Sequence, residues 1–170
     1  IEHYDNEGRI IRADFEDFSV LSVYVPSASN IERLDFKLQF AEDFLEYIKK
    51  LQREIPNLVI CGDFNICHEE IDIHNPKGLK NTSGFLPVER EWMTKFLKEC
   101  NLIDSFRYLH PDKQEFSWWS YRQNSRAKNL GWRLDYHFIT KSLENQLERA
   151  LILKEAVHSD HCPVYIELKD

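Results

Sequence analysis

The sequence predicts an α/β protein in which helices cover layers of β-sheet. Three observations support this fold class. Residues 58–61 form a continuous apolar run rich in β-branched side chains, which is typical of a strand buried on both faces. Residues 9–15 and 19–25 alternate apolar and polar side chains, which predicts two further strands. Residues 31–54 carry apolar side chains at helical spacing, which predicts a long amphipathic helix.

The first two strands are separated by Glu16 and Asp17, so we expect them to form a hairpin. Ser29 or Asn30 is the expected N-cap of the long helix, and Pro56 ends it. The apolar face of this helix is expected to consist of Leu34, Leu38, Ala41, Leu45, Ile48 and Leu51.

Further along the chain, residues 67–86 are polar and predict a long irregular loop. A second helix is expected from Pro87 to about Glu99. Its apolar face would contain Trp92, Phe96, Leu97 and Cys100. Short strands are expected near residues 102–106, 116–119, 132–139, 147–153 and 163–168. Because the sequence shows no internal repeat and no linker, residues 1–170 are expected to form one domain.

The composition is that of a folded globular protein, with 42% hydrophobic residues. The longest apolar runs are far too short to span a membrane, and no apolar signal segment is visible, so we expect no membrane contact and no secretion. The four cysteines lack the spacing of a metal or disulfide framework, which favours a reducing compartment: the cytoplasm of a bacterium or the nucleus of a eukaryote. The net charge of −7 argues against non-specific coating of nucleic acid.

The predicted buried strand ends in Asp63 and Asn65, a carboxylate and an amide two residues apart. Residues i and i+2 of an extended chain point the same way, so both side chains would face the space beyond the strand. A simple turn is the alternative, because Gly, Asp and Asn are common turn residues.

Two other carboxylates are candidates for chemistry. Asp160 and His161 stand before the last predicted strand, where they either cap the strand or place a metal-binding carboxylate beside a proton-handling imidazole. Asp135 lies inside a predicted strand and therefore needs a partner. That partner is either Arg133 or Arg149 in a salt bridge, or an imidazole whose tautomer Asp135 would fix.

Residues 116–134 form a basic and aromatic segment without a single acidic residue. Its basic and aromatic residues are Arg122, Arg126, Lys128, Arg133, Trp118, Trp119, Tyr121 and Trp132. Basic side chains interleaved with aromatic ones suit phosphate contacts and base stacking. The alternative is a solvated basic loop over a Trp-rich core.

Taken in order, these motifs resemble those of the exonuclease III family of apurinic/apyrimidinic endonucleases, within the endonuclease/exonuclease/phosphatase superfamily. The matching motifs are Tyr24-Val25-Pro26, Gly62-Asp63-Phe64-Asn65, Asn75-Pro76-Lys77-Gly78, Gly84-Phe85 with Glu89-Arg90, Ser105-Phe106, Gly131 to Tyr136, and Ser159 to Pro163. The resemblance runs from about residue 19 to the last residue and implies a DNase I-like four-layer αββα sandwich. The family's early motifs, including a metal-binding Glu, have no counterpart here, so the chain resembles the C-terminal two-thirds of such an enzyme, and the fold is expected to be partial.

The resemblance implies an Mg²⁺- or Mn²⁺-dependent DNA-repair phosphodiesterase that acts on double-stranded DNA, cutting 5′ to abasic sites, with removal of 3′ nucleotides or blocks as a further expectation. Asp63 would activate the attacking water and Asn65 would contact the scissile phosphate. His161, positioned by Asp135, would bind the phosphate, and Tyr24 would act at the leaving or attacking oxygen.

The resemblance also assigns ligands. Asp160 and Asp63 would lie at the metal, with the main Glu ligand upstream. The substrate-binding residues would be Lys77, Trp118, Arg122, Arg126, Trp132 and Leu134, of which Trp118, Trp132 and Leu134 match a small apolar pocket for a flipped-out abasic sugar. Ser27 stands where the family has Asn, and Trp118 stands where Phe is common.

Two other functions remain open at this point: a phosphodiesterase acting on lipid or inositol phosphates, and a DNA-binding piece without activity, because the metal-binding Glu is absent. The parent enzyme is expected to be a monomer. The chain by itself is expected to expose a sheet edge or an apolar face, and therefore to pair with a second copy unless an N-terminal part covers this surface. It is also expected to be inactive or weakly active, because the metal-binding Glu is absent.

Overall fold

The structure is a computed structural model that describes residues 2–28 and 31–169; the expected N-cap residues, Ser29 and Asn30, lie outside them. The strands are β1 (Ile10–Asp14), β2 (Ser19–Tyr24), β3 (Leu58–Asp63), β4 (Leu102–Asp104), β5 (Trp118–Trp119), β6 (Gly131–Trp132), β7 (Asp135–Thr140), β8 (Leu147–Ile152) and β9 (Val164–Leu168). The helices are α1 (Glu2–Asn6), α2 (Ile31–Leu51), α3 (Pro76–Leu79), α4 (Pro87–Glu99) and α5 (Ser105–Leu109). Three 3₁₀ turns are η1 (Glu70–Asp72), η2 (Arg122–Asn124) and η3 (Lys141–Gln146).

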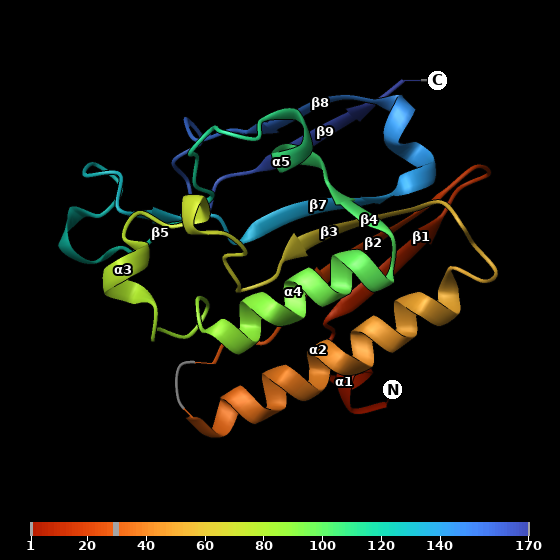
Figure 1. Cartoon of the computed structure of the whole chain (residues 1–170), viewed down its shortest axis with the longest axis horizontal. Coiled ribbons are helices and arrows are strands. Elements are labelled where there is room, and N and C mark those ends of the chain that lie inside the picture. Colours follow the sequence, from red (N-terminus) through yellow and green to blue (C-terminus); the bar gives the residue numbers. More distant parts are fainter. Residues whose placement is uncertain (1, 29–30, 170) are drawn as a thin grey trace.

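A mixed five-stranded sheet with the order β1-β2-β3-β7-β4 forms the centre of the molecule (Figure 1). The predicted hairpin is confirmed, because β1 and β2 are antiparallel neighbours. β2 and β3 are parallel, and helix α2 connects them across one face of the sheet. β7 lies antiparallel to both β3 and β4. This order brings the end of β2, the end of β3 and the start of β7 together at the same end of the sheet.

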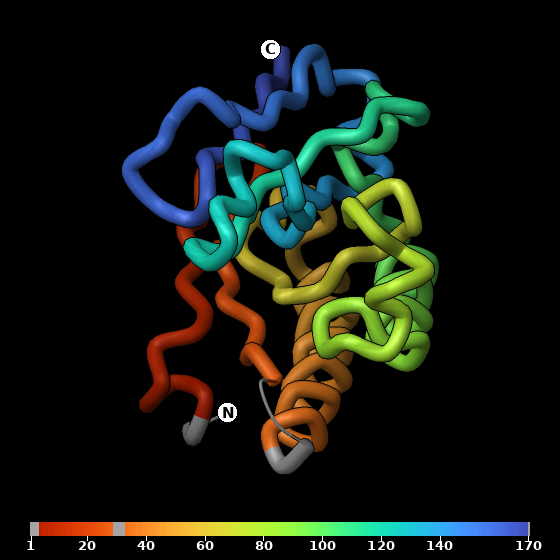
Figure 2. The backbone as a smooth tube through the Cα atoms, turned by 90° about the vertical axis from the view of Figure 1, so that its left-hand side faces the viewer, coloured from red at the N-terminus to blue at the C-terminus, as the bar shows by residue number. Residues whose placement is uncertain are grey.

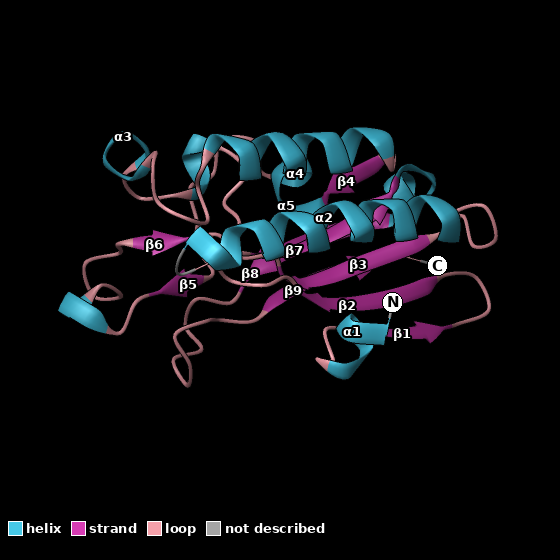
Figure 3. Ribbon diagram, turned by 90° about the horizontal axis from the view of Figure 1, so that it is seen from below, coloured by secondary structure: helices cyan, strands magenta, loops and turns pink. Residues whose placement is uncertain are grey.

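The described residues form three consecutive layers, as Figures 1 and 3 show. Helices α2 and α4 lie side by side on one face of the sheet, where Leu58 and Ile60 of β3 join their apolar cluster. On the other face, Val59 of β3 packs in a cluster with Leu147 of β8, next to Ile166 of β9. β3 is therefore buried on both faces, as predicted. The helix–sheet–sheet order confirms the predicted α/β class and the DNase I-like layering in its partial form.

Four sequence predictions needed correction. The loop at 67–86 contains η1 and α3, and the side chain of Asn75 caps α3 by accepting from the N–H of Gly78 at 3.1 Å. The strand expected near 102–106 ends at Asp104, where α5 begins. The strand expected at 132–139 is interrupted, because the N–H of Arg133 binds the Asp72 carbonyl at 2.8 Å instead of a neighbouring strand. Helix α2 ends at Leu51, three residues before the end expected from the sequence, and α1, η2 and η3 were not predicted.

The loops converge at one end of the sheet. Figure 2 views this end and shows the yellow-green segment 67–86, the green-to-cyan segment 110–130 and the blue segment 153–163 gathered together. Strand β1 forms one edge of the five-stranded sheet. Among the described strands it pairs only with β2, and its residue Ile11 is 71% exposed. The expected self-association through such an edge stays a prediction. Of the helices in the described ranges, none combines the length and the apolar character needed to cross a membrane.

Candidate active site

Cross-strand register places three predicted site residues in one row. Tyr24 on β2 lies opposite Asp63 on β3, and Asp63 lies opposite Asp135 on β7. Residues directly opposite one another project from the same face of a sheet, so the three side chains stand together at the sheet's end. The two preceding rows on this face are Ser22, Cys61 and His137, and then Val20, Val59 and Ile139. The face thus changes from apolar core to acidic site within four residues.

The turn after β3 holds Asp63 in place. Its carboxylate accepts the backbone N–H of Asn65 at Oδ1 (2.8 Å) and the Asn65 side-chain amide at Oδ2 (3.1 Å). Asn65 has a φ of 53°, and its amide also donates to the Val25 carbonyl at 3.0 Å. At Gly62, an added Cβ would lie 1.9 Å from the Val23 carbonyl oxygen, so only glycine fits. The motif is therefore both a turn and a site, and the Asn65 amide orients Asp63.

The electrostatics of the row favour a proton acceptor. Burial, followed by the charge of the neighbouring Asp135, raises the pKa of Asp63 to about 6. The Asn65 N–H and the positive charges of His161 and Lys37 oppose this rise. A carboxylate with a raised pKa is a stronger base than an ordinary Asp and is still ionised near neutral pH.

His161 is the partner of Asp135. Its Nδ1 lies 2.8 Å from Asp135 Oδ2, and because an ionised carboxylate only accepts, Nδ1 carries the proton and Nε2 is the second ring nitrogen. Burial by itself would lower the pKa of His161, but the hydrogen bond and charge of Asp135, together with the charges of Asp63 and Asp160, outweigh burial and raise this pKa. The choice left open for Asp135 is settled in favour of the imidazole.

These residues open into a cleft of about 390 Å³. Its lining residues are Tyr24, Ser27, Asp63, Asn65, Thr82, Ser83, Gly84, Trp118, Trp132, Leu134 and His161. One wall is apolar: the rings of Trp118 and Trp132 meet edge to face with centroids 6.1 Å apart, and Leu134 beside them is buried. The Asp63 carboxylate and the His161 imidazole line the same cleft, and the ring centroid of His161 lies 6.4 Å from that of Trp118. A polar reactive end thus adjoins a small aromatic wall.

Five of the predicted residues do not line this cleft: Lys77, Arg122, Arg126, Asp135 and Asp160. Asp135 is connected to the cleft through its hydrogen bond to His161. Lys77 and Arg122 are exposed. The guanidinium of Arg126 donates to the backbone carbonyls of Lys154 (3.0 Å), Ala156 (2.6 Å) and Ser159 (2.7 Å), and it lies 4.5 Å from the ring centroid of Trp119. Arg126 therefore fastens the 153–163 loop to the aromatic core, a role that the basic pattern alone did not indicate.

The metal ligands predicted from the resemblance do not form a complete site within the described ranges. Over residues 2–28 and 31–169, no three His, Cys, Asp or Glu side chains gather closely enough to hold a metal ion. The Asp160 carboxylate instead accepts hydrogen bonds from Trp118 Nε1 at 2.9 Å and from Ser159 Oγ at 3.2 Å. Asp63 and Asp160 alone do not make a closed cation site.

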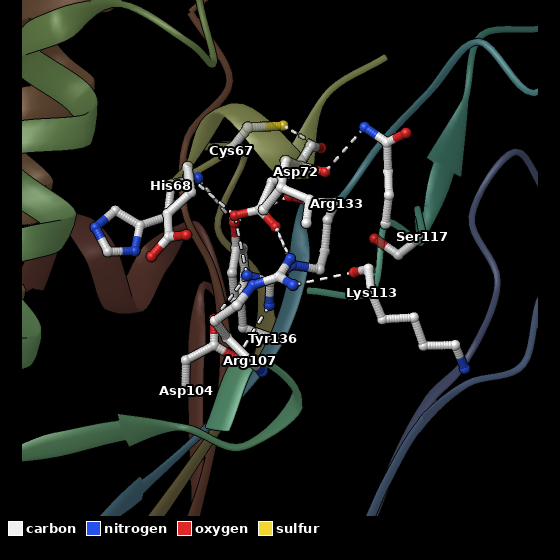
Figure 4. A network of polar contacts seen from close by, with 12 residues as sticks. Cys67, His68, Asp72, Asp104, Arg107, Lys113, Ser117, Arg133 and Tyr136 are labelled. Atoms are coloured by element: carbon white, nitrogen blue, oxygen red, sulfur yellow. Dashed lines mark hydrogen bonds and ion pairs between the residues drawn. The ribbon is translucent and has the colours of Figure 1, made fainter. Parts of the chain in front are cut away.

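A buried ionic network, drawn in Figure 4, is centred on Arg133, which lies in the sequence between Trp132 and Leu134 of the apolar wall. Arg133, only 1% exposed, binds Asp72 through Nε (2.7 Å) and Nη2 (3.0 Å), and Asp104 through Nη1 (3.0 Å) and Nη2 (2.7 Å). Arg107 adds a 2.6 Å contact to Asp72. The network fixes the chain between Trp132 and Leu134. The alternative pairing of Arg133 with Asp135, which their closeness in sequence had left open, is not the one found, because Arg133 binds Asp72 and Asp104.

An α/β sandwich with a carboxylate, a His–Asp pair and an aromatic wall in one cleft is the arrangement expected of a phosphodiesterase, and comparisons with known proteins identify the family. The model of the endonuclease/exonuclease/phosphatase family matches residues 1–161, and the chain therefore belongs to this family.

Relatives narrow the assignment. The chain is 45% identical over 166 residues to an exodeoxyribonuclease of Bacillus subtilis (96% of this chain, 65% of the relative). It is 44% identical over 169 residues to the DNA repair nuclease APEX1 of Danio rerio (98% of this chain, 54% of the relative). A crystal structure of an AP endonuclease from Leishmania major superposes with a TM-score of 0.87 at 27% identity, over 96% of this chain and 55% of that one. These matches confirm the resemblance to the exonuclease III family. The chain spans only 54 to 65% of the length of these three relatives.

Proposed function

We propose that this chain forms the catalytic cleft of a DNA-repair phosphodiesterase that cuts the backbone 5′ to abasic sites. The observation that carries the proposal is the meeting of Asp63 and the Asp135–His161 pair with a small aromatic wall in one cleft. The names of the relatives, an exodeoxyribonuclease, a DNA repair nuclease and an AP endonuclease, support DNA as the substrate.

In the proposed reaction, Asp63 takes a proton from the attacking water, and the two hydrogen bonds from Asn65 keep its carboxylate aimed. His161 is anchored through Nδ1 and presents Nε2 to a phosphate oxygen, where a protonated ring stabilises the developing negative charge. Tyr24, whose side chain is half-exposed at the cleft, supplies a hydroxyl at the attacking or leaving oxygen.

The aromatic wall explains why a missing base would be preferred. A sugar without a base can leave the helix at little cost, whereas an intact nucleotide must first be unpaired and unstacked, which costs a few kcal/mol. Trp118, Trp132 and Leu134 offer an apolar surface suited to the bare sugar. The same cleft at a 3′ end would permit removal of terminal nucleotides or blocks.

Phosphate contacts outside the cleft are expected from the exposed basic side chains of the 116–134 segment. Arg122 and Lys128 are exposed, whereas the donors of Arg126 are already engaged by backbone carbonyls. Replacing Arg122 and Lys128 with Gln should weaken DNA binding and flatten the slope of log K against log salt by up to about two units, because each phosphate contact contributes roughly 0.9. Fluorescence anisotropy titrations at several salt concentrations measure this slope. An unchanged slope would show that both residues belong to a solvated loop that does not contact DNA.

We also propose that the reaction needs a hard divalent cation, Mg²⁺ or Mn²⁺, which when bound would neutralise charge on the phosphate. The test uses the protein expressed from its full coding sequence and a duplex with a single abasic site. Incision on the 5′ side is expected with Mg²⁺, loss of incision with excess chelator, and recovery when Mg²⁺ is restored. Full activity in chelator would contradict the cation requirement.

The same assay separates the alternative functions. Hydrolysis of phosphoinositides without incision of abasic DNA would identify a lipid or inositol phosphodiesterase. Tight binding to abasic DNA without cleavage under any cation would identify a DNA-binding protein. Either result would overturn the proposed function.

A further inference from the structure

A lysine and a glutamate are buried together directly behind the cleft, outside the groups that the proposed reaction uses. Lys37 of α2 is 1% exposed and Glu89 of α4 is 0% exposed, and Lys37 Nζ lies 2.5 Å from Glu89 Oε1. Burying two charges is costly, and a buried ion pair often adds less stability than apolar side chains of similar size. Its position at this point therefore calls for an explanation other than stability.

The lysine reaches the turn that carries the carboxylate. Besides Glu89, its ammonium donates to the backbone carbonyl of Asn65 at 2.8 Å. Asn65 is the residue whose N–H and amide hold Asp63, and its left-handed backbone conformation (φ of 53°) needs such an anchor. Lys37 thus binds the far side of the same turn that aims Asp63.

The glutamate binds the segment that lies next to this turn. Its Oε2 accepts the N–H groups of Gly84 at 2.6 Å and Leu86 at 2.9 Å, and Oε1 lies 3.4 Å from the hydroxyl of Ser83. Ser83 and Gly84 line the cleft, and Gly84 is so close to Asn65 that an added Cβ would lie 3.1 Å from the Asn65 carbonyl oxygen.

We propose that Lys37 and Glu89 are positioning residues that set the distance between the Asp63–Asn65 turn and the Ser83–Gly84 wall of the cleft. The inference rests on the proposed function for its kinetic consequence, but the geometry it describes exists with or without catalysis. A shift of about 1 Å in a reacting group can cost up to 100-fold in rate, so the effect should fall on turnover rather than on DNA binding.

The chain offers a matched control. Lys95 and Glu42 also join α4 to α2 through a 2.7 Å ion pair, but this pair is exposed and does not line the cleft. Because Lys37→Met alone would leave the Glu89 charge buried and unpaired, the main test is the double variant Lys37→Met/Glu89→Gln, which removes both charges. It is compared with Lys95→Met/Glu42→Gln and with the charge-preserving Lys37→Arg, all in the protein expressed from its full coding sequence.

We expect the buried double variant to lose about 10- to 100-fold in kcat on an abasic duplex, with KM within about threefold of the parent. The single variant Lys37→Arg keeps the positive charge and should have a kcat close to that of the parent. The exposed control should retain the parent's kcat. Thermal unfolding of each variant ensures that only folded protein is compared. A buried double variant that is folded and keeps the parent's kcat would overturn the positioning role.

A second readout does not depend on catalysis. Amide hydrogen exchange at Asn65 and Gly84 should accelerate by tenfold or more in the buried double variant and remain unchanged in the exposed control. Unchanged exchange at both amides would refute the proposal. If the parent protein cleaves no abasic DNA, the proposed function fails, whereas accelerated exchange would still support the positioning of the turn.

Discussion

Replacing Asp63 with Asn is expected to reduce the rate of abasic-site incision by about 100-fold or more, while the Kd for abasic DNA stays nearly unchanged. Asn has the same shape as Asp but cannot take the proton of the attacking water. The Asp63 carboxylate accepts hydrogen bonds from Asn65 and lines the cleft. The exposed basic residues expected to bind DNA do not line this cleft, so the Kd should not depend on the charge of Asp63. Single-turnover kinetics measure the rate, and fluorescence anisotropy measures the Kd.

The comparison variant is Asn65→Asp, which keeps the turn residue type but removes the amide that orients Asp63 and adds a like charge beside it. It should also lower the rate. Equal losses in rate and in DNA binding for Asp63→Asn would show instead that Asp63 maintains a structural turn on which the DNA surface depends.

The second large effect concerns stability. Asp72→Asn should lower the free energy of unfolding by about 3 to 5 kcal/mol, because it removes one charged partner of a fully buried arginine. Asp72 is 0% exposed and binds Arg133 through both carboxylate oxygens, as well as Arg107. Urea unfolding followed by tryptophan fluorescence gives the free energy directly.

The control for this measurement is Glu42→Gln, which breaks the exposed ion pair with Lys95. Exposed pairs contribute little, so its free energy of unfolding should hardly change. A decrease below about 1 kcal/mol in Asp72→Asn would mean that Asp104 alone compensates the charge of Arg133. In that case the network would serve to shape the wall rather than to stabilise the fold.

Local pattern sufficed for the elements whose periodicity was strong. The apolar run at 58–61 identified the central strand, the spacing from Ala41 to Leu51 identified the buried face of α2, and Pro87 marked the start of α4. Short elements were less visible, because α3 and η1 depend on local caps and α5 follows β4 without a break. The buried Lys37 also had a signal, since it lies between Leu34 and Ala41 on the inner face of the helix.

The sequence by itself determined the family motifs, the turn that presents Asp63 and the identity of the groups that could do chemistry. Tertiary structure alone decided their partners. Asp135 binds His161, 26 residues away, rather than its near neighbour Arg133, because antiparallel pairing of β7 with β3 puts it in the polar row. Arg133, two residues earlier, lies on the buried side and takes Asp72 and Asp104. Which charges meet inside a protein depends on strand register and on what else is buried, because an unpaired charge there costs more than any local contact can offset.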